Sequence, residues 1–229
     1  MTKPFRYQVE AVEQVEAFSG RCLLALEMGL GKSLISLLYA ERHPEARPLV
    51  IVCPASVKWV WEHECRTHMG WRAYIAEGVR PPLFRLGATT HNVTIVNYDI
   101  LAPSKHGPGW LDFLKALRPQ MVVIDECQAI KDMGSKRAKA VHSLCQGVKH
   151  VLGTSATPLV NRPAELYSIL HLIRPDLYPA WWPFAHRHCG ARRLPWGWEF
   201  KGATRLNELH NQLTGNLMIR FRKADVLKD

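Results

Sequence analysis

The sequence predicts an α/β domain with a central, mostly parallel β-sheet that is flanked by helices. Five short and nearly continuous apolar runs are typical of strands buried on both faces of a parallel sheet. They cover residues 22–26, 49–54, 93–98, 121–126 and 150–155. Helix-length segments alternate with these runs, as in doubly wound α/β domains. A chain of 229 residues, of which 47% are hydrophobic, can bury the core of one such domain.

The helices expected between the strands cover residues 33–42, 56–69, 110–117 and 135–145. We therefore expect residues 1–173 to form one lobe. After Pro175 the segment combines prolines, aromatic residues and basic residues without a clear period. A helix is predicted over 204–213, with Leu206, Leu209 and Leu213 on one face. We interpret 174–229 as a Trp/Arg-rich appendage that packs on the lobe.

The charge is unevenly distributed along the chain, which has a net charge of +10. Residues 1–115 hold 13 basic and 11 acidic side chains, whereas residues 116–229 hold 17 basic and 9 acidic ones. A basic second half is expected if that half borders a polyanion. Charge alone leaves open a solvated basic surface that has no partner.

Composition also bears on the cellular compartment of the protein and on whether it binds zinc. The six cysteines include no CxxC pair, and several lie inside apolar runs, so we expect reduced core residues. His186 and His188 lie beside Cys189, but no second ligand pair follows at zinc spacing. The N-terminal residues include no apolar core of a signal peptide, and no apolar run approaches the length of a membrane span. We expect a soluble, intracellular protein.

A phosphate-binding loop is predicted at "GLGKS", residues 29–33, between an apolar run and a helical segment. Backbone N–H groups in such a loop can surround phosphates at a helix N-terminus. Lys32 is expected to reach the β- and γ-phosphates, and the Ser33 hydroxyl to bind Mg²⁺. The full loop pattern has glycine where Leu26 stands. A chance glycine-rich turn is the alternative.

The run "MVVIDECQ" supplies the carboxylates of a nucleotide site. Asp125, at the end of a buried strand, is placed to hold Mg²⁺, and Glu126 is a candidate base for the attacking water. An adjacent Asp–Glu pair is also common in surface turns. Because this pair follows a phosphate loop by about ninety residues, we favour the nucleotide interpretation. The next run ends in "LGTSATP", where Ser155 and Thr157 are candidates to couple the Asp–Glu segment to other surfaces.

Six segments occur in a recognisable order: "FRYQVEAV", "EMGLGKS", "VIVCPASVKWVWEHE", "VTIVNYDIL", "DECQAIKDMGSKRAKAV" and "LGTSATPLVNRPAELYSIL". This set resembles the motifs of the first RecA-like lobe of superfamily-two helicases, specifically the Swi/Snf-type DNA translocases. The tail "YPAWWPFAHRHCGARRLPWGWEF" is most similar to the HARP-like annealing-helicase subgroup. The resemblance covers essentially the whole chain and implies a RecA-like P-loop fold.

The resemblance implies ATP and Mg²⁺ as cofactors and DNA as a sequence-independent partner, whether duplex, forked or single-stranded. Gln8 would contact the adenine. The remaining ATP-binding positions are Tyr7, Met28, Gly29, Leu30, Gly31, Lys32 and Ser33. The implied DNA contacts are Ser56, Lys58, Asn97, Tyr98, Lys131, Lys136 and Arg137. The segment 181–205 would add stacking on unpaired or junction bases. Its tryptophans have a second interpretation, which is packing of the appendage on the lobe.

Some residues depart from the family pattern. Where Leu26 stands, the family usually has an acidic residue, and where Ser33 stands it commonly has threonine. "DECQ" and "SAT" stand where the family frequently has other motif sequences. Lys32, Asp125 and Glu126 are all retained. The family motor also has a second RecA-like lobe with arginine fingers, which this chain does not supply before its last residues, "RKADVLKD". We therefore expect nucleotide binding but little hydrolysis by these residues alone, because an arginine finger contributes roughly 10³–10⁵ in rate.

Two other functions stay open on the sequence. One is a non-catalytic DNA- or partner-binding module that consists of a lone RecA-like lobe. The other is a phosphotransferase that uses the same phosphate loop, against which the whole series of helicase-like segments argues.

Overall fold

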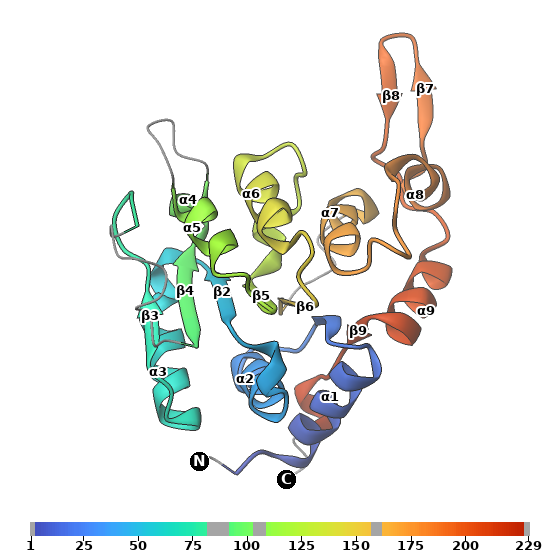
Figure 1. Cartoon of the computed structure of the whole chain (residues 1–229). Helices are drawn as coiled ribbons and strands as arrows, with labels where there is room; N and C mark the ends of the chain where they lie inside the picture. Colours follow the sequence, from blue (N-terminus) through green and yellow to red (C-terminus); the bar gives the residue numbers. More distant parts are fainter. Residues whose placement is uncertain (1–2, 82–91, 103–108, 157–161, 227–229) are drawn as a thin grey trace.

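The computed structural model describes residues 3–81, 92–102, 109–156 and 162–226. A seven-stranded sheet with the order β3-β4-β2-β5-β6-β1-β9 forms its centre, and every neighbouring pair of strands is parallel (Figure 1). The strands are β1 (Arg21–Leu24), β2 (Leu49–Cys53), β3 (Ala73–Ile75), β4 (Val93–Asn97), β5 (Met121–Asp125), β6 (His150–Thr154) and β9 (Met218–Ile219). The predicted α/β fold and all five predicted strands are confirmed.

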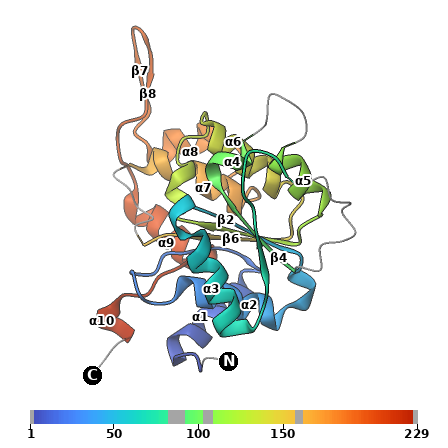
Figure 2. The same ribbon diagram turned by 90° about the vertical axis from the view of Figure 1, so that its left-hand side faces the viewer.

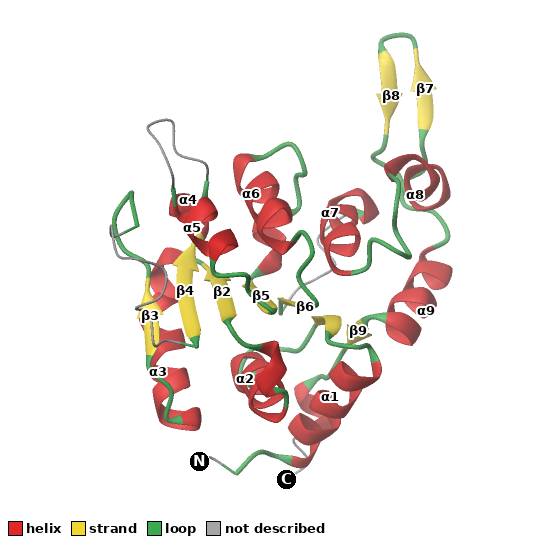
Figure 3. Cartoon of the chain, viewed as in Figure 1, coloured by secondary structure: helices red, strands yellow, loops and turns green. Residues whose placement is uncertain are grey.

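Helices cover both faces of the sheet (Figure 3). On one face lie α1 (Arg6–Ala17), α2 (Lys32–Arg42) and α3 (Lys58–Met69), and on the other α4 (Tyr98–Leu101), α5 (Trp110–Ala116), α6 (Lys136–Cys145) and α7 (Pro163–Ile173). The pleat divides each strand between the two layers. In β2, Val50 and Val52 pack in one hydrophobic cluster, and Leu49 and Ile51 pack in the other. Burial on both faces explains the continuous apolar runs.

The C-terminal part starts with α8 (Trp181–His188) and a two-stranded antiparallel hairpin, β7 (Arg192–Leu194) and β8 (Gly197–Glu199). Figure 2 shows the hairpin projecting beyond the helices. It is followed by α9 (Leu206–Asn216), β9 and α10 (Lys223–Val226). The predicted helix is present, and Leu209 and Leu213 are buried, whereas Leu206, which starts the helix, is 51% exposed.

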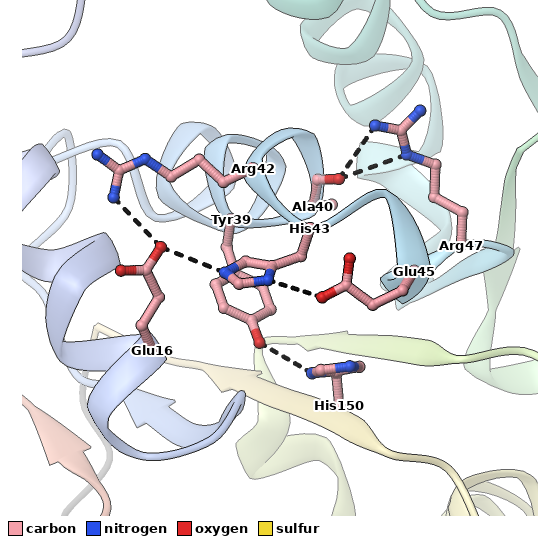
Figure 4. Close-up of polar contacts among 8 residues, drawn as sticks. All are labelled: Glu16, Tyr39, Ala40, Arg42, His43, Glu45, Arg47 and His150. Carbon is pink, nitrogen blue, oxygen red and sulfur yellow. Dashed lines mark hydrogen bonds and ion pairs between the residues drawn. The ribbon is translucent and has the colours of Figure 1, made fainter.

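Polar side chains fasten α1 and α2 to the start of β6 (Figure 4). The Tyr39 hydroxyl and His150 Nδ1 are 2.8 Å apart, and the Glu16 carboxylate lies 3.2 Å from both Arg42 and His43. Gly20 adopts φ +71°, and a Cβ there would lie 2.3 Å from both the Tyr39 oxygen and His150 Nδ1. Only glycine fits at this crossing. These contacts hold the amino end of β6. The predicted nucleotide site lies at the other end of the strands, where β1 and β5 finish.

The predicted environment of the cysteines is confirmed, since all six are buried and free. Burial raises the pKa of Cys53 to about 12, which makes its thiol unreactive at neutral pH. Among the described residues, no helix combines the length and apolar character needed to cross a membrane.

Candidate nucleotide site

The phosphate loop connects β1 to α2 and depends on two glycines in the left-handed region. Gly29 has φ +84° and Gly31, which caps α2, has φ +74°. The Lys32 ammonium donates to the carbonyl of Leu26 at 3.0 Å, so the lysine lies across its own loop. Burial lowers the pKa of Lys32, while the negative charges of Glu126 and Asp125 oppose that lowering. The lysine and the two carboxylates therefore share one site.

Gln8 and Tyr7 of α1 lie directly against this loop. The Gln8 amide nitrogen and the Tyr7 hydroxyl both approach the Leu30 carbonyl, at 3.4 and 3.3 Å. The Gln8 side-chain oxygen accepts from the Phe5 N–H at 3.0 Å. A Cβ at Gly31 would lie 2.5 Å from the Gln8 nitrogen, so Gly31 is needed for space as well as for its φ. The structure thus brings Tyr7 and Gln8 to the predicted phosphate loop, and Met28 on that loop is 72% exposed.

The Asp125 carboxylate is held by three donors at the end of β5. Oδ2 accepts from the Trp61 indole N–H at 2.9 Å, and Oδ1 accepts from the Thr154 hydroxyl at 2.7 Å and from the Glu126 N–H at 3.1 Å. The Tyr98 hydroxyl donates to the Asp125 carbonyl at 2.6 Å. These bonds fix the orientation of a carboxylate that is only partly exposed, as surrounding hydrogen bonds do for metal ligands.

Glu126 occupies an unusual backbone position, with φ +51° and ψ +54°. Non-glycine residues rarely adopt this conformation, and strain of this kind clusters at functional sites. The Glu126 carboxylate accepts from the Gln128 amide, whose oxygen accepts from the Ser155 hydroxyl at 2.9 Å. Ser155 therefore reaches the Asp–Glu segment through Gln128. Thr157 lies outside the described residues.

The side chains near the phosphate loop and the Asp–Glu segment suit a hard cation. Ser33, Asp125 and Glu126 offer only oxygen ligands, which Mg²⁺ prefers. The Ser33 hydroxyl donates to Glu64 Oε2 of α3 at 3.3 Å, which adds a further carboxylate beside the predicted ligand. No local sequence pattern indicated Trp61, Thr154 or Glu64, because each reaches the site from another element of the fold.

The end of the described chain also reaches the phosphate loop. The Glu27 N–H donates to the Phe221 carbonyl at 3.3 Å, and the Lys223 N–H donates to Glu27 Oε2 at 2.9 Å. The Lys223 side chain would lie 3.7 Å from a Cβ at Gly29. The Phe221 ring packs at 6.1 Å from Tyr7. Residues from both ends of the chain thus contact the nucleotide loop.

The predicted DNA-contacting residues divide into two groups. Asn97 and Tyr98 are buried, so in this structure neither presents its side chain to a partner, and Tyr98 instead donates to the Asp125 carbonyl. The exposed candidates are Ser56, Lys131, Lys136 and Arg137, and Lys58, which is half-buried, donates to the Ala76 carbonyl at 2.9 Å.

Two of the exposed cations already have partners. Lys131 pairs with Glu165 at 3.2 Å and Arg137 pairs with Asp99 at 2.6 Å. Exposed pairs of this kind are weak, so phosphate can replace the carboxylates. The helix α3 contains two tryptophans that differ in exposure. Trp61 is buried, whereas Trp59 is 62% exposed.

Comparison with known proteins shows which proteins this chain is similar to. A homologue of SWI/SNF-related matrix-associated actin-dependent regulator of chromatin subfamily A-like protein 1 from Caenorhabditis elegans is 37% identical over 227 residues, covering 98% of this chain and 32% of the relative. DNA annealing helicase and endonuclease ZRANB3 from Bos taurus is 30% identical over 213 residues, covering 91% of this chain and 20% of the relative. The chain therefore spans only a minor part of the length of the relatives it matches.

A solved structure shows the same fold. The Sulfolobus solfataricus SWI2/SNF2 ATPase core in complex with dsDNA superposes with a TM-score of 0.78 at 23% identity, over all of this chain and 47% of that one. The family model of the SNF2-related domain matches residues 7–229. The chain belongs to the SNF2-related domain family, as its ordered segments predicted.

Proposed function

We propose that this chain is the ATP-binding lobe of a DNA-dependent ATPase that moves along, remodels or anneals duplex or branched DNA without reading its sequence. The observation that carries the proposal is the placement of the Lys32 loop beside Asp125 and Glu126, because Thr154 pairs both with Leu24, which leads into the loop, and with Asp125. The relatives named as annealing helicases support the DNA-directed activity. Such a protein would work inside the cell, where ATP and DNA occur together.

Each residue of the site has a distinct role in this proposal. Lys32 leaves the Leu26 carbonyl to bind the β- and γ-phosphates, and Gln8 with Tyr7 recognises the adenine. Ser33 and Asp125 would hold Mg²⁺, which would neutralise part of the phosphate charge. Glu126 orients the attacking water and accepts its proton, while Gln128 holds the Glu126 carboxylate in place.

The proposed DNA contacts lie on the exposed cations near the site. The first turn of α6 has no acidic residue and instead carries Lys136 and Arg137. Cations at a helix N-terminus are unfavourable with the helix dipole unless an anion is nearby. Asp99 already supplies such an anion to Arg137 at 2.6 Å. A DNA phosphate would supply one to Lys136, and the contact would depend steeply on salt.

A second RecA-like lobe, in the same or another chain, is the proposed partner that completes the ATP site. These 229 residues supply one side of the site, so we expect them to bind ATP and hydrolyse it very slowly. An arginine finger contributed by the other lobe would raise the rate by roughly 10³–10⁵.

The test is to measure ATP binding and steady-state hydrolysis by this chain, with and without forked and duplex DNA, beside Lys32→Ala. We expect Mg²⁺-dependent nucleotide binding that is lost in Lys32→Ala, with minimal turnover. Robust DNA-stimulated turnover would contradict the incomplete site. DNA binding with no nucleotide binding would instead identify the non-catalytic module.

A further inference from the structure

The tryptophans of segment 181–205 do not share one environment. Trp181 packs edge-on against Tyr167 and Phe200, with ring centroids 5.2 and 5.1 Å apart, and so joins the appendage to α7. Trp196, in the turn between β7 and β8, is 83% exposed. Of the two interpretations of this segment, packing therefore fits Trp181 and does not fit Trp196.

An aromatic cluster packs the hairpin that carries Trp196 against α8. The Trp198 ring lies 5.3 Å from both Trp182 and His186, and Trp182 also contacts Phe200 at 5.6 Å. A two-stranded ribbon is marginally stable alone, and these rings supply the apolar support that it lacks. In the turn, Pro195 restricts the backbone just before Trp196. The turn that contains Trp196 thus forms the end of a projecting hairpin (Figure 1).

The charge of the projection favours a polyanion. Residues 187–205 include five basic side chains and only one acidic side chain, Glu199. Glu199 pairs with Arg192 at 2.8 Å and Lys201 at 3.4 Å, while Arg193 is exposed on the strand opposite Trp198. Exposed rings beside cations are the combination that binds nucleic acid by stacking and phosphate contacts.

The size of the apolar tip favours a base over a protein surface. A stable protein partner needs about 800 Å² per side, more than Trp196 can bury even together with the partly exposed rings of Trp182 and Trp198. One nucleobase, in contrast, matches one indole face. A base becomes available for stacking where a duplex opens or branches.

We propose that the β7–β8 hairpin engages DNA at a junction, with Trp196 stacked on the base or terminal base pair exposed there, and Arg192 and Arg193 on the flanking phosphates. The inference rests on the proposed function, because it assumes that the chain binds DNA. It adds a preference for branched over continuous duplex, which the motif residues near the ATP site do not explain.

The experiment compares binding of a forked DNA and of a closed duplex without free ends, by fluorescence anisotropy, for the unmodified chain, Trp196→Ala, Trp196→Phe and Trp59→Ala. A 2-aminopurine at the fork junction reports stacking. Trp59→Ala is the matched control, since Trp59 is also exposed and lies outside the hairpin. We expect Trp196→Ala to weaken fork binding by roughly 10-fold, the effect of losing one base–aromatic stack, with duplex binding unchanged.

Trp196→Phe is expected to restore most of the fork binding and the 2-aminopurine quenching. Equal binding of the fork by Trp196→Ala and the unmodified chain, or an equal loss on fork and duplex, overturns the hairpin proposal while leaving the ATPase proposal intact. If the unmodified chain binds neither DNA, both proposals fail.

Discussion

The Asp125–Glu126 corner and the β7–β8 hairpin contrast in how they hold their functional side chains. At the corner, Asp125 receives three internal hydrogen bonds and Glu126 is held by Gln128, so the geometry is set by partners inside the domain. On the hairpin, Trp196 extends into solvent and only the base of the ribbon is packed. A site that must fix a metal needs such preorganisation, whereas a surface that meets a large partner needs accessibility.

The largest difference is expected in stability. Trp110 is fully buried in the core beside α6, and Trp110→Ala should lower the free energy of unfolding by about 3–5 kcal/mol through loss of packing. Trp196→Ala should change it by less than about 0.5 kcal/mol, because an exposed ring loses little on truncation. Urea denaturation of the two variants measures both values. A comparable loss in Trp196→Ala would show that the hairpin tip is structural.

A second substitution tests the preorganisation of the corner. Trp61→Phe keeps an aromatic ring but removes the indole N–H that donates to the Asp125 carboxylate. Loss of a hydrogen bond that orients a metal ligand typically lowers metal affinity by about 10–100-fold. We expect the gain in ATP affinity on adding Mg²⁺ to fall by about 10-fold, with metal-free binding unchanged. Titration with a fluorescent ATP analogue, with and without Mg²⁺, measures the gain.

Trp110→Phe is the matched control for this test. The Trp110 N–H also donates to a single oxygen, the carbonyl of Gly78 at 3.0 Å, and Gly78 belongs to neither the phosphate loop nor the Asp–Glu segment. It should leave the Mg²⁺-dependent gain intact. If both variants reduce that gain equally, the effect is general destabilisation and Trp61 has no positioning role.

The smallest effect is expected at the hairpin. Glu199→Gln removes the single acidic charge of residues 187–205 and frees Arg192 and Lys201 for phosphate. We expect fork binding to tighten by about two- to threefold at low salt, and the gain to vanish at high salt, where exposed charges are screened. Anisotropy titrations over a salt series measure it. Weaker binding would show that Glu199 is needed to hold the hairpin in shape.

The fold was predictable because its strongest signals are local. Strands buried on both faces produce uninterrupted apolar runs, and the loop at Gly29 and Gly31 has a local backbone requirement. Strands β3 and β9 left no signal, since they contain only three and two residues. Their pairing is decided by neighbouring strands and not by their own composition.

The site was only partly predictable for a related reason. Lys32 and the Asp–Glu pair occur in recognisable local patterns, but Trp61 meets Asp125 across 64 positions of sequence. Tyr98 illustrates the opposite case. A resemblance assigned it to DNA contact, and the structure buries its side chain under the Asp125 carbonyl. Sequence patterns identify residues that act through local geometry better than residues whose orientation depends on packing.

The strand β9 gives the phosphate loop an unusual mechanical connection. The Leu217 carbonyl, just before β9, accepts from the Leu23 N–H, and the Ile219 carbonyl of β9 accepts from the Ala25 N–H. The following residues bond to both the main chain and the carboxylate of Glu27. No flexible linker separates these contacts. Tension applied along residues 218–223 is therefore transmitted directly to the loop, and a rearrangement of the loop must in turn displace the segment or break its bonds.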